Sequence, residues 1–116
     1  MSMTIHSQEH DDTVVVSING ELDMATAPDL HEHLRTLLEP GGRHLVLDLT
    51  ETSFCDSTGL SIFIYAKDRC EDAGTRIRLA APQRGVQRIL EVSGLVEVLP
   101  SSPTVTEAIT QVRATA

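Results

Sequence analysis

Aromatic residues are scarce in this chain of 116 residues, which has no tryptophan, one tyrosine and two phenylalanines. A core built from this sequence must therefore be aliphatic. The overall composition, with 41% hydrophobic and 22% charged residues, is typical of a folded protein rather than a disordered one. The length is enough for one core but not for two, so we expect a single domain over residues 1–116, with its folded core at about 4–113.

Positive charge is also scarce: Lys67 is the one lysine, and the formal net charge is -8. A chain this acidic is a poor ligand for nucleic acid, because a protein gains affinity for phosphate backbones by replacing their counterions with its own cations. We therefore expect no nucleic-acid partner. The negative charge instead favours a basic protein partner, since opposite fields speed association.

Long hydrophobic runs and closely spaced cysteines are missing as well. The densest apolar segment, residues 60–66, is far too short to span a bilayer, and the first twelve residues lack the basic start and apolar stretch of a signal peptide. Cys55 and Cys70 form no CxxC pair and predict no disulfide framework. These absences predict a cytoplasmic protein with no membrane partner. We also expect it to be a monomer when free.

What the sequence does contain is a regular alternation of strand-like and helix-like segments. Apolar and β-branched runs predict strands at residues 4–7, 13–19, 44–49, 76–80 and 96–99. Helical spacing predicts helices from Pro28 to Pro40, from Leu60 to Gly74, over 83–92, and after Pro103. This order predicts an α/β fold: a four- to five-stranded, mixed but mostly parallel sheet with about four helices and an antiparallel hairpin at its start.

Two of these helices rest on specific signals. For the first, Thr26 is the predicted N-cap and Pro28 fits the first turn. The apolar run at 60–66 fits a strand or a helix by pattern alone, and we predict a helix because its apolar residues fall on one side and Gly74 follows as a C-terminal cap. That inward side would carry Leu60, Phe63, Ile64, Lys67 and Cys70.

The most informative motif is Asp56-Ser57-Thr58-Gly59-Leu60, between a predicted strand and a predicted helix. One interpretation makes Ser57 a helix N-cap, whose side-chain oxygen accepts a backbone N–H and stabilises the helix by about 1 kcal/mol. The other makes Ser57 a phosphoacceptor, because a phosphate at a helix start meets free N–H groups and the positive end of the helix dipole. Thr58 is a second hydroxyl, but it falls inside the first turn and is less accessible.

The residues around Ser57 do not indicate an enzyme. The Gly-x-Ser-x-Gly elbow is absent, and His44 begins the preceding strand, at the opposite end of the sheet. Cys55 would be a nucleophile at a helix N-terminus, but a partly buried structural cysteine explains it better. His31 and His33 are two apart on a helix, so their rings diverge and predict no metal site. No phosphate-binding glycine loop is present.

A receiver-type phosphoprotein is a further alternative, because Asp48 lies near the end of a strand in Leu-Asp-Leu. Such domains hold Mg²⁺ with an acidic pair after their first strand, whereas Asp11 and Asp12 precede the strand at 13–19. They also need a lysine after a later strand, and Lys67 lies within a predicted helix. We therefore set this interpretation aside.

Sites in parallel sheets lie at the carboxyl ends of the strands, where residues 20–23 and 53–59 are both predicted to be. We expect these two segments to form one surface. Together with the remaining motifs, they resemble an anti-sigma factor antagonist of the STAS domain family. The resemblance runs from Thr13 to about Val112, and its marks are GELD at 20–23 with Thr26 following, LVLDL at 45–49, FCDSTGL at 54–60, and QRIL at 87–90 before SGL at 93–95.

This resemblance implies a STAS fold and a binding protein, not an enzyme. It implies that Ser57 is phosphorylated by a partner that is both anti-sigma factor and serine kinase. The unphosphorylated protein would bind that partner and release a sigma factor, the phosphorylated protein would not bind, and a phosphoserine phosphatase would reset it. The kinase would supply ATP and Mg²⁺, so no cofactor is expected here. The implied partner-binding residues are Asp23, Thr26, Asp56, Ser57, Thr58, Gly59 and Leu60.

Two positions depart from the family pattern: Cys55 stands where a larger apolar residue is common, and Ser61 stands where glycine is common. Neither change removes the phosphoacceptor, although Cys55 opens the possibility of a redox input. An alternative function is a STAS interaction module within a lipid-transport or stress-signalling complex. The phosphoacceptor motif favours the sigma-factor pathway over that alternative.

Overall fold

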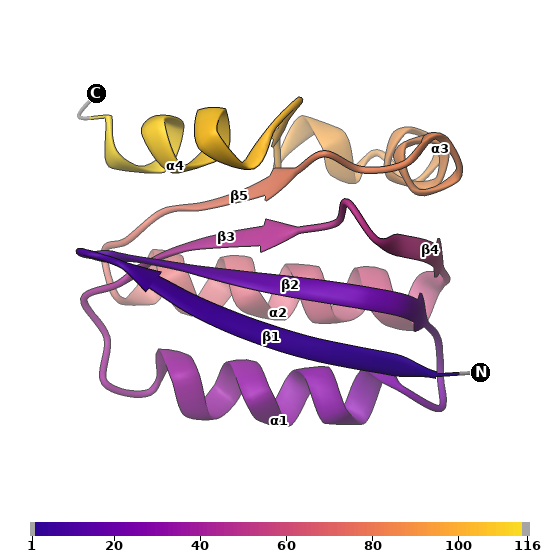
Figure 1. The fold of residues 1–116 in the computed structure, drawn as a ribbon, viewed down its shortest axis with the longest axis horizontal. Coiled ribbons are helices and arrows are strands. Elements are labelled where there is room, and N and C mark those ends of the chain that lie inside the picture. The colour runs from indigo at the N-terminus through magenta and orange to yellow at the C-terminus, as the bar shows by residue number, and fades with distance from the viewer. Residues whose placement is uncertain (1, 115–116) are drawn as a thin grey trace.

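The computed structural model describes residues 2–114 as one mixed sheet with helices on both faces (Figure 1). The strands are β1 (Met3–His10), β2 (Thr13–Leu22), β3 (His44–Asp48), β4 (Thr52–Cys55), β5 (Ile77–Ala80) and β6 (Ser101–Ser102). The helices are α1 (Ala27–Leu38), α2 (Ser57–Asp72), α3 (Arg84–Val92) and α4 (Val105–Arg113), with a short 3-10 helix, η1 (Leu95–Glu97).

The sheet is mostly parallel, as the alternation of elements predicts. Its order is β1-β2-β3-β5-β6, and β4 pairs with the second half of β2. Only the opening hairpin, β1 with β2, is antiparallel among the strand pairs of the described chain. The α/β fold class is confirmed, but the sheet has six strands, where four to five were predicted.

The additional strand is β4, which the sequence did not reveal because Thr52–Cys55 is short and half polar. The prediction that the second strand ends at Asn19, before Gly20, is wrong, since β2 continues to Leu22. Gly20 has φ +113°, and the pairing register shifts after it as β2 changes its neighbour to β4. A side chain at Gly20 would also collide with the backbone oxygen of Ser2, so glycine allows this strand to continue past the irregularity.

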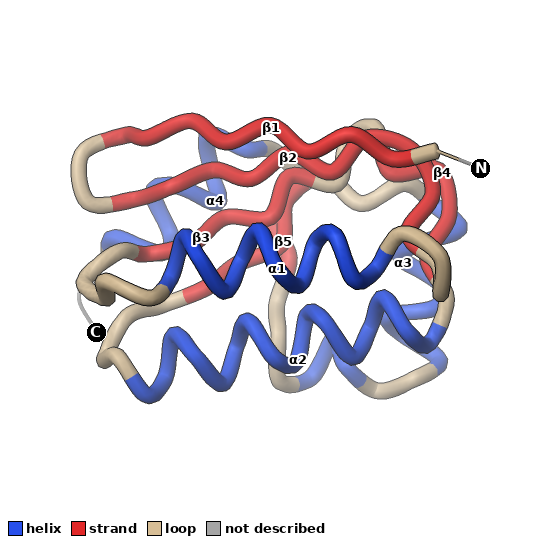
Figure 2. The backbone as a smooth tube through the Cα atoms, turned by 90° about the horizontal axis from the view of Figure 1, so that it is seen from below, coloured by secondary structure: helices blue, strands red, loops and turns tan. Residues whose placement is uncertain are grey.

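The helices form two layers around the sheet. Helices α1 and α2 lie side by side across one face, as Figure 2 shows in the view from below, and α4 covers β3 and β5 on the other face. The inner face of β2 illustrates the resulting core, since Val14, Val16 and Ile18 are fully buried against α1 and α2. The opposite face buries Val46 and Ala80 beneath α4. Apart from Phe63 and the two cysteines, the buried core of the described residues is aliphatic, as the composition predicts.

Two further local predictions are wrong. Residues 96–99 do not form a strand: Gly94 takes a left-handed φ of 80° and leads into η1, whose Leu95 packs into the core together with Leu99. The last strand is the two-residue β6 instead. Ile64 does not face inward and is 45% exposed, because α2 turns its residues Gly59, Phe63, Ala66 and Cys70 toward the core.

Candidate partner-binding site

Two strand ends meet at one corner of the sheet, at the right-hand end of Figure 1. Strands β2 and β4 pair in parallel there, with Leu22 opposite Cys55, and the Asp56 N–H donates to the Leu22 carbonyl at 3.2 Å. The segments 20–23 and 53–59 therefore lie side by side, as the sheet topology predicts. Helices α1 and α2 both begin at this corner.

The start of α2 is capped by Asp56. Its Oδ1 accepts hydrogen bonds from the backbone N–H groups of Thr58, at 2.9 Å, and Gly59, at 3.1 Å. Ser57 is the first residue of the helix and is exposed, and its hydroxyl makes no hydrogen bond with any other residue of the described chain. The interpretation of Ser57 as the helix N-cap is therefore wrong, and its hydroxyl is available for chemistry.

The start of α1 is held differently. Asp23 Oδ1 accepts from the N–H groups of Ala25, at 2.9 Å, and Thr26, at 3.1 Å. Thr26 occupies the N-cap position, as predicted, but its side chain does not cap the helix. Its hydroxyl donates to the Glu21 carbonyl at 2.8 Å and accepts from the Asp23 N–H at 2.9 Å. Thr26 is 8% exposed, so its hydroxyl stabilises the loop by these internal hydrogen bonds and offers little surface to a partner.

Gly59 sets how closely α2 approaches the sheet. A Cβ atom at this position would lie 2.7 Å from Cys55 Sγ and 2.8 Å from Leu22 Cγ. Such contacts are too short for real carbon atoms, so only glycine fits without movement of its neighbours. Leu60, the next residue, is half-buried and packs against the core.

The predicted binding residues thus divide into two groups. Thr26 and Gly59 are buried, and they determine the conformation of this corner rather than offering surface to a partner. The residues with surface to offer a partner are Asp23, Asp56, Ser57, Thr58 and Leu60.

The chemistry of Cys55 argues against a nucleophile at this corner. Burial raises the pKa of the Cys55 thiol to about 12, and the neighbouring Asp56 carboxylate adds to the shift. The thiol is therefore neutral at physiological pH, whereas reactive cysteines depend on a lowered pKa and access. This protonated, buried side chain gives no support to the redox input that the sequence left open.

The electrostatic character of the corner is uniformly acidic. The two segments that meet there, residues 20–26 and 52–60, contain Glu21, Asp23 and Asp56 and no lysine or arginine. A phosphate on Ser57 would add roughly -1.5 to -2 charges to this surface. Because Asp56 already accepts from two N–H groups of the helix start, the phosphate would have fewer free donors than the sequence predicts.

Sequence reasoning missed two apolar contributors to this surface. Met24, directly after Asp23, is 75% exposed, and its signal was a large apolar side chain in the turn between a strand and a helix. On α2, Ser57, Ser61 and Ile64 are all exposed and follow one another at helical spacing, so they form one stripe. Exposed apolar side chains beside polar ones are typical of protein–protein contact surfaces.

The other candidate functional residues lie away from this corner or make hydrogen bonds within the protein. Asp48, the residue of the receiver alternative, accepts a hydrogen bond from the Ser17 hydroxyl at 3.2 Å and from the Thr50 N–H at 3.0 Å. His44 accepts from the Arg76 N–H at 3.0 Å, at the amino end of β3 and far from Ser57 along the sheet. Among residues 2–114, no group of three His, Cys, Asp or Glu side chains could hold a metal ion.

Comparison with known proteins places this arrangement in a family. A family model described as the STAS domain matches residues 4–108. The chain belongs to the STAS domain family. The resemblance seen in the sequence motifs is thereby confirmed. Within the described residues, none of the helices of this STAS domain has the length and apolar character to cross a membrane.

Relatives of this STAS domain include the anti-sigma-B factor antagonist of Staphylococcus epidermidis, which is 27% identical over 99 residues, covering 85% of this chain and 92% of that protein. The solved structure of an anti-sigma factor antagonist from Mycobacterium paratuberculosis matches with a TM-score of 0.90 at 32% identity, covering 97% and 96% of the two chains. SpoIIAA of Bacillus, an anti-sigma factor antagonist solved in its unphosphorylated form, shares the fold, with a TM-score of 0.81 at 24% identity and 99% coverage of both chains.

Proposed function

We propose that this STAS domain is an anti-sigma factor antagonist controlled by phosphorylation of Ser57. The unphosphorylated form binds an anti-sigma factor that is also a serine kinase, and thereby releases a sigma factor. Phosphorylation of Ser57 abolishes that binding, and a phosphoserine phosphatase restores it. The single observation that carries the proposal is the free, exposed Ser57 hydroxyl at a helix start whose cap is supplied by Asp56.

The division of labour between Asp56 and Ser57 suits a reversible switch. Because Asp56 holds the helix start, a phosphate can be added to Ser57 without breaking a hydrogen bond on which the fold depends. The names of the relatives from Staphylococcus and Mycobacterium support the assignment to sigma-factor control. The domain is then a binding protein and a kinase substrate rather than an enzyme, with ATP and Mg²⁺ supplied by its partner.

The acidic corner explains how the phosphate would act. In the unphosphorylated complex, Met24 and the stripe of Ser57, Ser61 and Ile64 offer apolar and small polar contacts. A phosphate at the centre of this surface would have to lose its water beside Asp23 and Asp56, with no cation of this chain to neutralise it. A loss of about 2.8 kcal/mol weakens binding a hundredfold.

The test is binding of the host's anti-sigma factor kinase to purified variants, measured by calorimetry. Ser57→Ala is expected to bind as wild type does and to resist release by ATP, whereas Ser57→Asp is expected to bind at least tenfold more weakly. Thr106→Asp is the matched control, because it adds the same charge in the exposed first turn of α4, on the other face of the sheet. It should bind normally.

Two results would contradict the proposal. Equal binding of Ser57→Ala and Ser57→Asp would remove the phosphoswitch. Failure of every form to bind an anti-sigma factor, together with capture of lipid-transport or stress-signalling subunits, would assign the domain to a different assembly.

A further inference from the structure

One edge of the sheet is left open. Strand β6 pairs only with Leu79 and Ala80 at the end of β5. Ile77 and Arg78, at the start of β5, have no strand beside them on that side within the described chain. A strand edge of this kind presents backbone N–H and C=O groups that a further extended segment can pair with.

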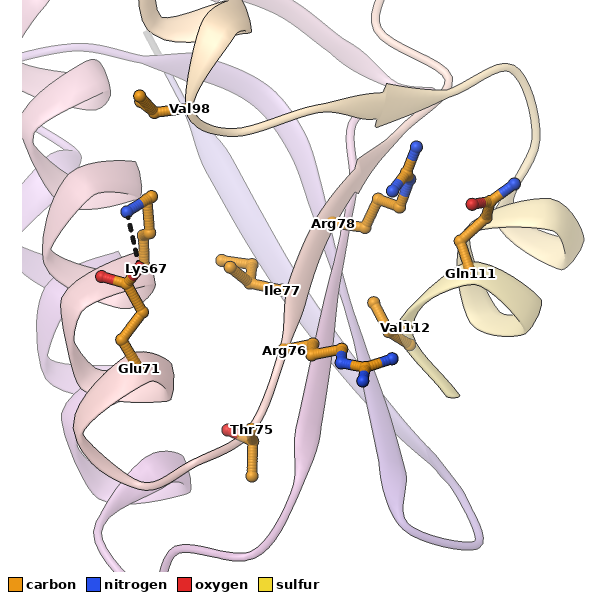
Figure 3. A pocket seen from close by; sticks show the side chains of 9 residues that line it. All are labelled: Lys67, Glu71, Thr75, Arg76, Ile77, Arg78, Val98, Gln111 and Val112. Carbon is orange, nitrogen blue, oxygen red and sulfur yellow. Dashed lines mark hydrogen bonds and ion pairs between the residues drawn. The ribbon is translucent and has the colours of Figure 1, made fainter. Parts of the chain in front are cut away.

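This open edge forms the floor of a groove between two helices. The cavity has a volume of about 250 Å³ and lies between α2 on one side and α4 on the other. Figure 3 shows Lys67 projecting from α2, Val112 from α4, and β5 running between them. Ile77 points toward the α2 side, and Val98 extends the apolar part of the lining. We refer to this feature as the β5 groove.

The charge of the β5 groove is opposite to that of the molecule. Its lining includes Lys67, Arg76 and Arg78, which are three of the nine cationic residues of the chain, and only one acidic residue, Glu71. The lining therefore carries a formal charge of +2 (three minus one), whereas the whole chain carries -8.

The three cationic side chains differ in the ion pairs and hydrogen bonds that they make within the molecule. Lys67 Nζ lies 3.0 Å from a Glu71 carboxylate oxygen, and Arg78 Nε donates to the Ser102 hydroxyl at 2.8 Å. Arg76 is exposed, and no ion pair joins its side chain to another residue of the described chain. Arg76 is thus the cation with the most freedom to meet an incoming acidic group.

We propose that the β5 groove binds an extended acidic segment of a partner protein, which adds as a strand beside Ile77. The backbone edge would supply hydrogen bonds, and alternate side chains of the segment would face the two helices. Acidic side chains on one face would meet Arg76 and Arg78, and small apolar ones on the other would contact Ile77 and Val98. The combination of an open strand edge, an apolar floor and opposite charge carries this assignment.

Two other interpretations fit less well. Small-molecule sites are usually cavities of roughly 300–1,000 Å³ that enclose most of their ligand, and the β5 groove is smaller. Charged residues also protect sheet edges against aggregation. Protection alone does not account for the contrast with β1, the strand at the opposite edge of the sheet, which has no lysine or arginine in Met3–His10.

The β5 groove is separate from the Ser57 surface. Lys67 is ten residues after Ser57 on α2, which corresponds to about 15 Å along a helix. The groove lies at the amino end of β5, whereas Ser57 lies at the carboxyl ends of β2 and β4. Both sites can therefore be occupied at once, and loss of binding at one leaves the other measurable.

The test is selection from a displayed library of random ten-residue peptides on wild-type protein, with counter-selection on Arg76→Glu. Enriched peptides are expected to carry Asp or Glu at alternate positions, with Val or Ile between them. A synthetic peptide of the most enriched sequence should shift the amide resonances of Ile77 and Val98. Arg76→Glu should weaken its binding at least tenfold and Arg76→Gln less, whereas Arg88→Glu, the same change on the exposed surface of α3, should stay within twofold.

Strand addition itself is tested with the same peptide methylated on alternate backbone nitrogens, which removes the donors that pair with β5. This version should bind at least tenfold more weakly. The proposal is overturned by a selection that returns no acidic sequences, by resonance shifts confined to another surface, by equal binding of the methylated peptide, or by a groove occupied by a second copy of this chain.

Discussion

Helices α1 and α2 begin at the same corner of the sheet, and an aspartate and a hydroxyl residue lie at the start of each. At α1, the Thr26 hydroxyl is buried and makes hydrogen bonds with two backbone groups of the preceding turn. At α2, the Ser57 hydroxyl is exposed and makes no hydrogen bond with another residue of the described chain. In both cases an aspartate, Asp23 or Asp56, accepts backbone N–H groups at the helix start.

The comparison distinguishes a hydroxyl group that stabilises the fold from one that is accessible for modification. A hydroxyl that completes the hydrogen bonding of buried backbone groups cannot be modified without loss of those bonds. A hydroxyl whose capping role has passed to its neighbour can be modified at little cost to the fold. The two helix starts thus use the same residue types for different purposes, and four experiments break or sharpen this contrast.

The largest effect is expected from Gly59→Ala, which disturbs the start of α2 and leaves α1 untouched. The added methyl group would collide with Cys55 and Leu22, both buried, and overpacking of this kind typically costs about 1–3 kcal/mol. We expect the free energy of unfolding to fall by about 2–3 kcal/mol in urea denaturation. Removal of the sulfur in Gly59→Ala/Cys55→Ala should recover only part of the loss, because the contact with Leu22 remains.

Gly85→Ala is the matched control for this change. Gly85 lies in the first turn of α3, and a Cβ there would meet no atom within 4 Å beyond its chain neighbours and the backbone of its own helix. The substitution should be neutral or stabilising, because alanine is the better helix former. Equal stability of Gly59→Ala and Gly85→Ala would show that α2 can move away from the sheet freely.

The next effect is expected from Thr26→Val, which keeps the shape of the side chain and removes its hydroxyl. The Glu21 carbonyl and the Asp23 N–H would each lose a partner in a partly buried turn. Each unsatisfied buried group costs about 1–3 kcal/mol, so we expect a loss of about 2 kcal/mol after partial compensation by water. Thr36→Val, the same change at an exposed position of α1, should alter stability by less than about 0.5 kcal/mol.

A third experiment uses alkaline pH to probe the packing beneath α2. Burial raises the pKa of the Cys55 thiol to about 12 in the folded protein, from an ordinary value of 9.0. Above pH 9, the unfolded chain releases the proton while the folded protein keeps it. The stability contributed by the neutral thiol is therefore full below pH 9 and is lost as pH rises toward 12, by at most about 1.4 kcal/mol per pH unit.

We therefore expect the melting temperature to fall more steeply between pH 9 and pH 11 in wild type than in Cys55→Ala. Cys70 contributes in the same direction, because burial also raises the pKa of its thiol, so the variant should keep part of the slope. Parallel curves for the two proteins would mean that the Cys55 thiol is open to solvent.

Much of this arrangement follows from the sequence, because apolar periodicity reports which face of each element is buried. The parallel core strands were predicted on that basis. The approach of residues 20–23 to 53–59 was predicted because sites in parallel sheets lie at the carboxyl ends of the strands. The misses have local causes. Strand β4 is too short and too polar to show a pattern. Residues 96–99 are Val-Glu-Val-Leu, an alternating pattern typical of a strand, but the spacing of Leu95 and Leu99 is that of a helical turn, and both are buried.

The identity of the cap at α2 is the miss that matters most for function. Aspartate and serine are both good N-cap residues, so a shift of one position in the helix start exchanges their roles. That position depends on the packing of Gly59 against Leu22 and on the hydrogen bond from Asp56 to the end of β2. Neither contact is visible in the local sequence. The structure was therefore needed to show that Asp56, and not Ser57, caps the helix.

The smallest effect is expected at Ser57 itself, and it decides whether the contrast between the two helix starts is real. Ser57→Ala should change the free energy of unfolding by less than about 0.5 kcal/mol, because the hydroxyl is exposed and makes no hydrogen bond with a described residue. Asp56→Ala should cost about 1 kcal/mol, because it removes the acceptor of the Thr58 and Gly59 N–H groups. Urea denaturation of both variants against wild type measures the difference. The reverse order would return the capping role to Ser57, and a phosphate there would then act by loosening α2 rather than by altering a surface.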